Sequence, residues 1–171
     1  MNKDEFWKLI DSSRKKSKGD LDEQVDILRR QLQQLEASEI VQFDKIFRKY
    51  WARAYTWDLW GAAYIIGGGC SDDGFLDFRA WLISKGEKVY ESALKDPESL
   101  LKVVKEEDDD CQFEGLQYVA SEAWEAKTGK GMNDFPDCGV FHGDEPAGKR
   151  WSEEDDSLER RFPKLWKKFS E

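Results

Sequence analysis

YWARAYTWDLWGAAYIIGGGCSDDGFLDFRAWLI, residues 50–83, is the most informative stretch of the chain, because an apolar run, three glycines and several carboxylates follow one another within it. The apolar run begins after Thr56, a residue that caps helix N-termini, and ends at Gly67, because glycine accepts the left-handed backbone of a helix C-terminus. The run is apolar nearly all round, which indicates a central helix. Ser71 is placed to cap a second helix that extends to Ser84.

Helical periodicity continues on both sides of this stretch. Leu21, Val25 and Leu28 are spaced by four and three residues, as one face of a helix requires. The predicted helical segments are residues 3–15, 20–35, 38–54, 87–104 (two short helices divided before Pro97), 112–127 and 152–169, with Asp20, Ser38 and Ser152 as N-terminal caps and an interruption at Pro163. Residues 129–150 lack periodicity and should be irregular. No strand or internal repeat is predicted, so we expect an all-α fold: one compact multi-helix domain over residues 1–171.

Composition excludes several classes of protein. The 171 residues carry a net charge of -9, which repels a phosphate backbone and disfavours nucleic acid as a partner, while a basic protein partner remains compatible. Three cysteines without a CxxC pair are typical of a reduced, cytoplasmic protein. No apolar segment is long enough for a signal peptide or a membrane span. The acidic run at residues 106–110 is predicted to be a solvated loop.

The candidate functional residues lie around the glycines. We call residues 67–70 the glycine elbow. A packing role for its glycines, with two helices meeting at close range, is the expected one. The candidate cluster comprises Trp57, Asp58, Trp60, Cys70, Ser71, Asp72, Asp73, Asp77 and Arg79.

Several interpretations of this cluster stay open. Asp72 and Asp73 suit the positive end of a helix dipole, and Asp77 could pair with Arg53 or Arg79, which would make the cluster structural. The same carboxylates could face a partner's cations, or hold a divalent cation through oxygen ligands. They could also serve as acid and base beside an arginine that holds an anionic substrate.

Other sites are disfavoured. The glycines do not follow a strand and lack a Gly-Lys-Ser/Thr sequence, so a phosphate loop is not expected. Cys138 and His142, the only histidine, would supply two zinc ligands where a structural site needs four. The spacing of the aspartates is not that of an EF-hand. We therefore expect no metal and no cofactor.

The central stretch resembles the hallmark of a bacterial family known as domain of unknown function 4240. The similar stretch is RAYTWDLWGAAYIIGGGCSDDGFLDFRAWLISKG, and three outer segments also resemble the family: DEFWKLID, GLQYVASEAWEAKTGK and DSLERRFPKLW. The hallmark positions are Trp57, Asp58, Trp60, Gly67, Gly68, Gly69, Cys70, Ser71, Asp72, Asp73, Gly74, Phe75, Asp77, Phe78, Arg79 and Trp81. The resemblance implies a small, cytoplasmic, mostly helical bacterial protein without an assigned activity, and it brings no catalytic residues.

These residues are compatible with two functions. The first is a non-enzymatic protein-interaction domain that presents an acidic surface near the glycine elbow to a basic partner. The alternative is an enzyme of unknown reaction with a carboxylate and arginine site at Asp72, Asp73, Asp77 and Arg79.

Overall fold

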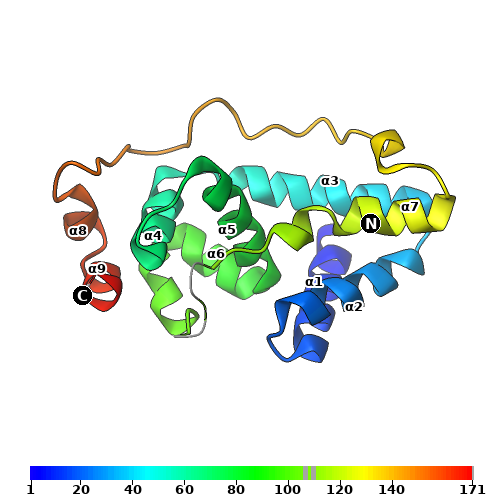
Figure 1. Cartoon of the computed structure of the whole chain (residues 1–171), viewed down its shortest axis with the longest axis horizontal. Helices are drawn as coiled ribbons and strands as arrows, with labels where there is room; N and C mark the ends of the chain where they lie inside the picture. Colours follow the sequence, from blue (N-terminus) through cyan, green and yellow to red (C-terminus); the bar gives the residue numbers. More distant parts are fainter. Residues whose placement is uncertain (106–107, 109–110, 171) are drawn as a thin grey trace.

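The computed structural model describes residues 1–105, 108 and 111–170, and it confirms the all-α prediction (Figure 1). The described α-helices are α1 (Lys3–Ser17), α2 (Leu21–Gln33), α3 (Ala37–Arg53), α4 (Trp57–Gly67), α5 (Asp72–Ser84), α6 (Glu87–Lys95), α7 (Val119–Thr128), α8 (Ser157–Arg161) and α9 (Pro163–Phe169). Three 3₁₀ turns accompany them: η1 (Pro97–Lys102), η2 (Glu114–Gln117) and η3 (Met132–Asp134). The predicted solvated loop at 106–110 lies outside the described residues, apart from Asp108.

Three of the predicted helix starts are confirmed by their caps. The backbone N–H of Glu23 donates to the Asp20 carboxylate at 2.8 Å, that of Leu59 to the Thr56 hydroxyl at 3.1 Å, and that of Gly74 to the Ser71 hydroxyl at 3.1 Å. Each of these side chains satisfies a backbone donor that has no partner within the helix.

Three predicted boundaries are wrong. Helix α3 begins two residues earlier than a Ser38 cap requires, because Glu36 is its N-cap residue. Ser152 caps nothing in the C-terminal segment, since α8 begins only at Ser157. The single helix predicted over 112–127 is divided into η2 and α7, which meet at Tyr118.

Helix α5 lies at the centre of the fold. It contacts α1, α3, α4, α6 and η2, and it buries nine of its residues, including Phe78 and Trp81, which are fully inaccessible. The α1–α2 hairpin packs beside it, and α7 returns along both α2 and α3. Burial of aromatic and aliphatic side chains from several helices drives folding.

A long irregular segment returns the chain to α4. Residues 135–156, which we call the strap, run along the outside of α3 before α8 and α9 pack at the far end of the molecule (Figure 1). Helix α9 contacts α4 and η1. An isolated bridge joins Ala147 of the strap to Thr56, and no strand forms elsewhere among the described residues. None of the described helices is both long and apolar enough to cross a bilayer.

Candidate functional site

Three stacked rings, those of Trp57, Trp60 and Phe75, lie at the first turn of α4, and we call them the aromatic floor. Trp57 and Trp60 are three residues apart, so they share a face of the helix, and their rings stack with centroids 5.4 Å apart and an angle of 7°. Trp60 continues the stack onto Phe75 of α5 at 5.1 Å and 10°. Both indoles are half-buried. The floor therefore joins α4 to α5 while keeping ring surface accessible.

The glycine elbow forms one side of the floor. Gly68 and Gly69 have φ values of 65° and 133°, and the Gly69 N–H donates to the Tyr64 carbonyl at 2.8 Å. A Cβ atom at either glycine would meet nothing within 4 Å. The expectation that these glycines allow two helices to approach closely is therefore wrong: the turn needs them for their positive φ. The Trp60 indole N–H donates to the Cys70 carbonyl at 3.0 Å and holds the elbow against the floor.

The C-terminal part of the chain, which we call the returning segment (residues 149–161), packs against the aromatic floor. Trp151 donates its indole N–H to the Trp57 carbonyl at 2.8 Å and meets the rings of Trp57 and Trp60 edge-on, at 5.9 and 6.3 Å. The close approach that glycine permits lies at Gly61, where a Cβ atom would come within 2.8 Å of Leu158 and 3.1 Å of Phe162.

Asp58 helps to hold the C-terminal part of the chain against α4. Its carboxylate pairs with Arg161 of α8 at 3.1 Å, and the same guanidinium donates to the carbonyls of Lys149 at 2.6 Å and Arg150 at 3.3 Å. The Arg161 side chain is only 18% exposed. Asp58 therefore anchors the returning segment rather than facing solvent alone.

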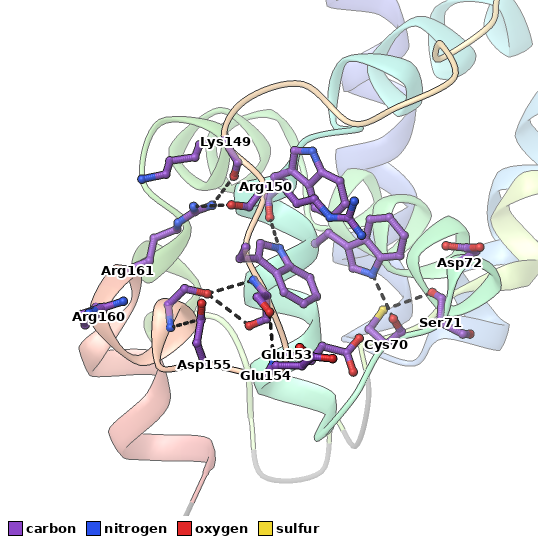
Figure 2. A pocket seen from close by; sticks show the side chains of 15 residues that line it. Cys70, Ser71, Asp72, Lys149, Arg150, Glu153, Glu154, Asp155, Arg160 and Arg161 are labelled. Carbon is purple, nitrogen blue, oxygen red and sulfur yellow. Dashed lines mark hydrogen bonds between the residues drawn. The ribbon is translucent and has the colours of Figure 1, made fainter.

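Between the elbow and the returning segment lies a cleft of about 1300 Å³, which we call the elbow cleft (Figure 2). Carboxylates and cations both line it. The lining residues are Trp57, Trp60, Cys70, Ser71, Asp72, Lys149, Arg150, Trp151, Ser152, Glu153, Glu154, Asp155, Ser157, Arg160 and Arg161.

Four carboxylates in the elbow cleft have no cation within 4 Å among the described residues: Asp72, Glu153, Glu154 and Asp155. Glu153 accepts from the Tyr64 hydroxyl at 3.2 Å. Asp155 accepts from the Ser157 N–H, and hydrogen bonds from the Ser157 side chain and backbone lower the pKa of Asp155. Of the cations, Arg160 pairs with Asp156 at 2.9 Å.

The remaining predicted residues point elsewhere. Asp73 is exposed and does not line the cleft. Asp77 is half-buried, and one of its carboxylate oxygens accepts from the Gln117 amide at 2.7 Å. Arg53 forms a two-pronged ion pair with Glu91 at 2.6 and 3.0 Å. The elbow cleft therefore collects five members of the predicted cluster: Trp57, Trp60, Cys70, Ser71 and Asp72. The other four lie outside its lining: Asp58, Asp73, Asp77 and Arg79.

Arg79 is fully buried among aromatic rings. Its guanidinium lies 3.7 Å from the centroid of Trp51, 4.7 Å from that of Tyr55 and 5.1 Å from that of Phe75. It donates to the carbonyls of Trp51 at 3.0 Å and Phe75 at 3.3 Å, whereas its second terminal nitrogen, Nη2, has no hydrogen-bond partner among the described residues. Burial lowers the pKa of Arg79 to about 10.

The model of the family described as "Protein of unknown function (DUF4240)" matches residues 1–126. The chain belongs to this family. No curated protein and no solved structure matches the chain.

The DUF4240 match includes the aromatic floor, the glycine elbow and Arg79, but it ends before the strap. The elbow cleft is therefore built from two parts of the chain: its floor lies within the family match and its opposite wall, residues 149–161, lies beyond it. The terminal segment DSLERRFPKLW, in which the sequence resembles the family, also lies outside the matched range.

Sequence reasoning did not place residues 149–155 in the site. The signal that could have found them is Trp151, a lone tryptophan in a strongly polar stretch, together with Gly61 in the middle of an otherwise apolar helix. Within the described residues, no three His, Cys, Asp or Glu side chains are grouped as metal ligands would be. Cys138 and His142 both lie on the strap, and His142 packs against Tyr55.

Proposed function

We propose that this DUF4240 protein is a non-enzymatic protein-interaction domain whose elbow cleft binds a short basic segment of a partner protein. The observation that supports this is a set of three carboxylates with no cation within 4 Å among the described residues, Asp72, Glu153 and Glu154, which line the cleft together with the half-buried rings of Trp57 and Trp60. Such a surface attracts a lysine or arginine through charge and through the faces of the rings.

The floor of the cleft already accommodates one cation. The guanidinium of the chain's own Arg150 lies 5.2 Å from the centroid of the Trp57 ring, and Arg150 has no carboxylate within 4 Å among the described residues. A partner's arginine or lysine would find similar surroundings next to Trp60, with Asp72, Glu153 and Glu154 around it.

The distribution of charge in the cleft restricts which partner sequences it would bind. Lys149 and Arg150 lie on one side of the cleft, whereas Glu153, Glu154 and Asp155 lie on the other (Figure 2). A long, uniformly basic chain would meet repulsion at Lys149 and Arg150. A segment with two or three basic residues followed by a neutral or acidic one fits better. Nucleic acid does not fit, because the net charge of -9 repels it.

Titration calorimetry with a short peptide of arginine and glycine, ended by one glutamate, tests the proposal. The triple variant Asp72→Asn, Glu153→Gln, Glu154→Gln should bind about tenfold more weakly, since three partly exposed charge contacts contribute about 0.5 kcal/mol each. The matched control is Glu114→Gln, Glu125→Gln, Asp134→Asn, which removes the same charge from exposed positions outside the cleft. Equal weakening in both triple variants, or no binding to the native chain, would reject the elbow cleft as the binding site.

No geometric observation favours the enzymatic alternative. Asp72 lines the elbow cleft, but Asp73, Asp77 and Arg79 do not, and Arg79 is sealed under Trp51 and Tyr55. An acid, a base and an anion-holding group would have to share one accessible space.

A further inference from the structure

The middle of the strap, residues 136–146, is held on the body by few contacts, whereas residues 149–153 are anchored through Trp151, Glu153 and Arg161. Within the part of the chain that the structure describes, the strap has one backbone bridge, at Ala147. The Ala147 N–H donates to the Tyr55 carbonyl and its carbonyl accepts from the Trp57 N–H, both at 2.9 Å. Among the described residues, the backbone of residues 136–146 makes no hydrogen bond with the backbone of a helix. This middle part of the extended strap in Figure 1 therefore depends on a small number of side chains to stay in place.

His142 is one of these side chains, and it contacts two aromatic rings of α3 and the turn after it. Its ring lies 4.1 Å from the centroid of Tyr55 and 5.2 Å from that of Trp51, edge-on to both. The same two rings enclose the buried guanidinium of Arg79. We call Trp51, Tyr55 and Arg79 the arginine box, and the His142 ring packs against it.

Two nitrogen atoms at this contact have no hydrogen-bond partner among the described residues: Nη2 of Arg79 and Nδ1 of His142. A guanidinium only donates, whereas a neutral imidazole keeps one nitrogen as an acceptor. The two nitrogens are not hydrogen-bonded to each other, but a neutral imidazole adds no positive charge beside Arg79 and keeps a nitrogen that can accept. A protonated imidazole has two donors and a positive charge, so it would meet Arg79 with like charge and no acceptor.

We propose that His142 is a proton-sensitive latch that holds the strap on the arginine box when neutral and releases residues 136–147 when protonated. Burial and the charge of Arg79 lower the pKa of His142 in the closed form, while the Gly143 backbone and Asp144 raise it. The open form has the ordinary histidine pKa of about 6.5, so protons bind the open form more tightly. Closure is complete above that pH, and its equilibrium constant falls by up to about tenfold for each pH unit below it.

Two other charged residues lie near the latch, and they affect strap closure in opposite directions. On α3, Arg48 lies over the other contact ring, Trp51, and adds positive charge. Asp44 of α3 has a raised pKa, mainly because of burial and also because of the strap's Asp137, while Arg48 lowers it. Acid would neutralise Asp44 and remove its repulsion of Asp137, which favours closure. A variant without the imidazole separates this opposing effect from the latch.

The test uses the full chain without any ligand, so its outcome is independent of the proposed function. NMR follows the imidazole signal of the only histidine, and hydrogen exchange measures the protection factor of the Ala147 amide, which makes the bridge to Tyr55. Between pH 7.5 and 5.5 this protection should fall roughly tenfold in the native chain. In His142→Phe, which packs in the box but does not titrate, it should change less than twofold.

A second variant tests the role of the buried charge. In Arg79→Met the His142 titration midpoint should rise toward its ordinary value, because the nearby positive charge is gone. Unchanged protection in the native chain, an equal loss in His142→Phe, or an unchanged midpoint in a folded Arg79→Met variant would each overturn the latch. The comparison of the native chain with His142→Phe decides the question even where Arg79→Met does not fold.

Discussion

The guanidinium of Arg79 lies 3.7 Å from the ring centroid of Trp51 and donates to the carbonyl of the same residue at 3.0 Å. One residue thus supplies both a π face, from its side chain, and an acceptor, from its backbone carbonyl, to a fully buried cation. No carboxylate lies within 4 Å of Arg79 among the described residues, so ring faces and carbonyls replace the usual counter-ion. Removing a charge from water costs several kcal/mol, which these contacts must offset.

The first prediction separates the charge of Arg79 from its volume. Arg79→Met keeps most of the volume and removes the charge, so the free energy of unfolding should stay within about 1.5 kcal/mol of the native value. Arg79→Ala leaves a void among Trp51, Tyr55 and Phe75 and should lower that free energy by about 3 kcal/mol. Urea denaturation measures both. If the methionine variant were as unstable as the alanine variant, the charge itself would be required for folding.

The second prediction concerns the packing of the C-terminal helices on α4. Gly61→Val places carbon where Leu158 and Phe162 already approach, so it should lower the free energy of unfolding by about 2 kcal/mol and loosen α8. Denaturation and limited proteolysis at residues 149–169 provide the two measurements. Gly131→Ala is the control, because Gly131 has a φ of -69° and its nearest contact would be 3.8 Å away. A valine variant as resistant to protease as the native chain would contradict close packing at Gly61.

The third prediction is that alanine substitutions at two neighbouring glycines of the elbow change the stability of the fold differently. Gly68 has a φ of 65°, so Gly68→Ala should destabilise the fold by about 1 kcal/mol although its Cβ would meet no atom within 4 Å. Gly67 is the last residue of α4 and lacks a positive φ, so Gly67→Ala should be neutral or stabilise by up to about 1 kcal/mol. Thermal melts compare the two. A loss of the same size at both positions would refute the conformational explanation.

The elements that the sequence predicts well are those with local causes. Thr56 and Ser71 cap helices through backbone groups three residues away, and Pro163 begins α9 because proline suits the first turn of a helix. Periodicity fails where a segment is short: α7 begins at Val119, seven residues later than predicted, because residues 114–117 form a 3₁₀ turn against α5. The all-α class follows from the local signals alone.

The candidate site depends on contacts that no local signal encodes. Arg161 reaches Asp58 across 103 positions, and Glu153 reaches Tyr64 across 89. The elbow cleft exists only because the strap brings residues 149–161 back to the glycine elbow. Arg79 illustrates a second limit. An arginine beside aspartates in sequence suggests an exposed ion pair. The position of Arg79 on α5 instead directs its side chain into the interior, where its guanidinium packs against the rings of Trp51 and Tyr55.

The last prediction uses the pH dependence of a buried phenol. Tyr90 is fully inaccessible and donates its hydroxyl to the Tyr50 carbonyl at 2.7 Å, so Tyr90→Phe should lower the free energy of unfolding by about 1 kcal/mol at pH 7. Burial raises the pKa of Tyr90 well above its usual range, with Arg53 acting in the opposite direction. The folded pKa therefore exceeds the unfolded value of about 10, so the stability from the neutral phenol is complete below pH 10 and is lost as the pH rises further.

The difference between native chain and Tyr90→Phe should consequently shrink above pH 10, because only the native chain carries this phenol. Urea denaturation of both proteins from pH 7 to pH 11 measures the difference, and common effects of the other tyrosines cancel in the comparison. A difference that stayed constant over this range would mean that Tyr90 ionises as readily in the folded chain as in the unfolded one, which its burial beneath Tyr50 and Trp7 opposes.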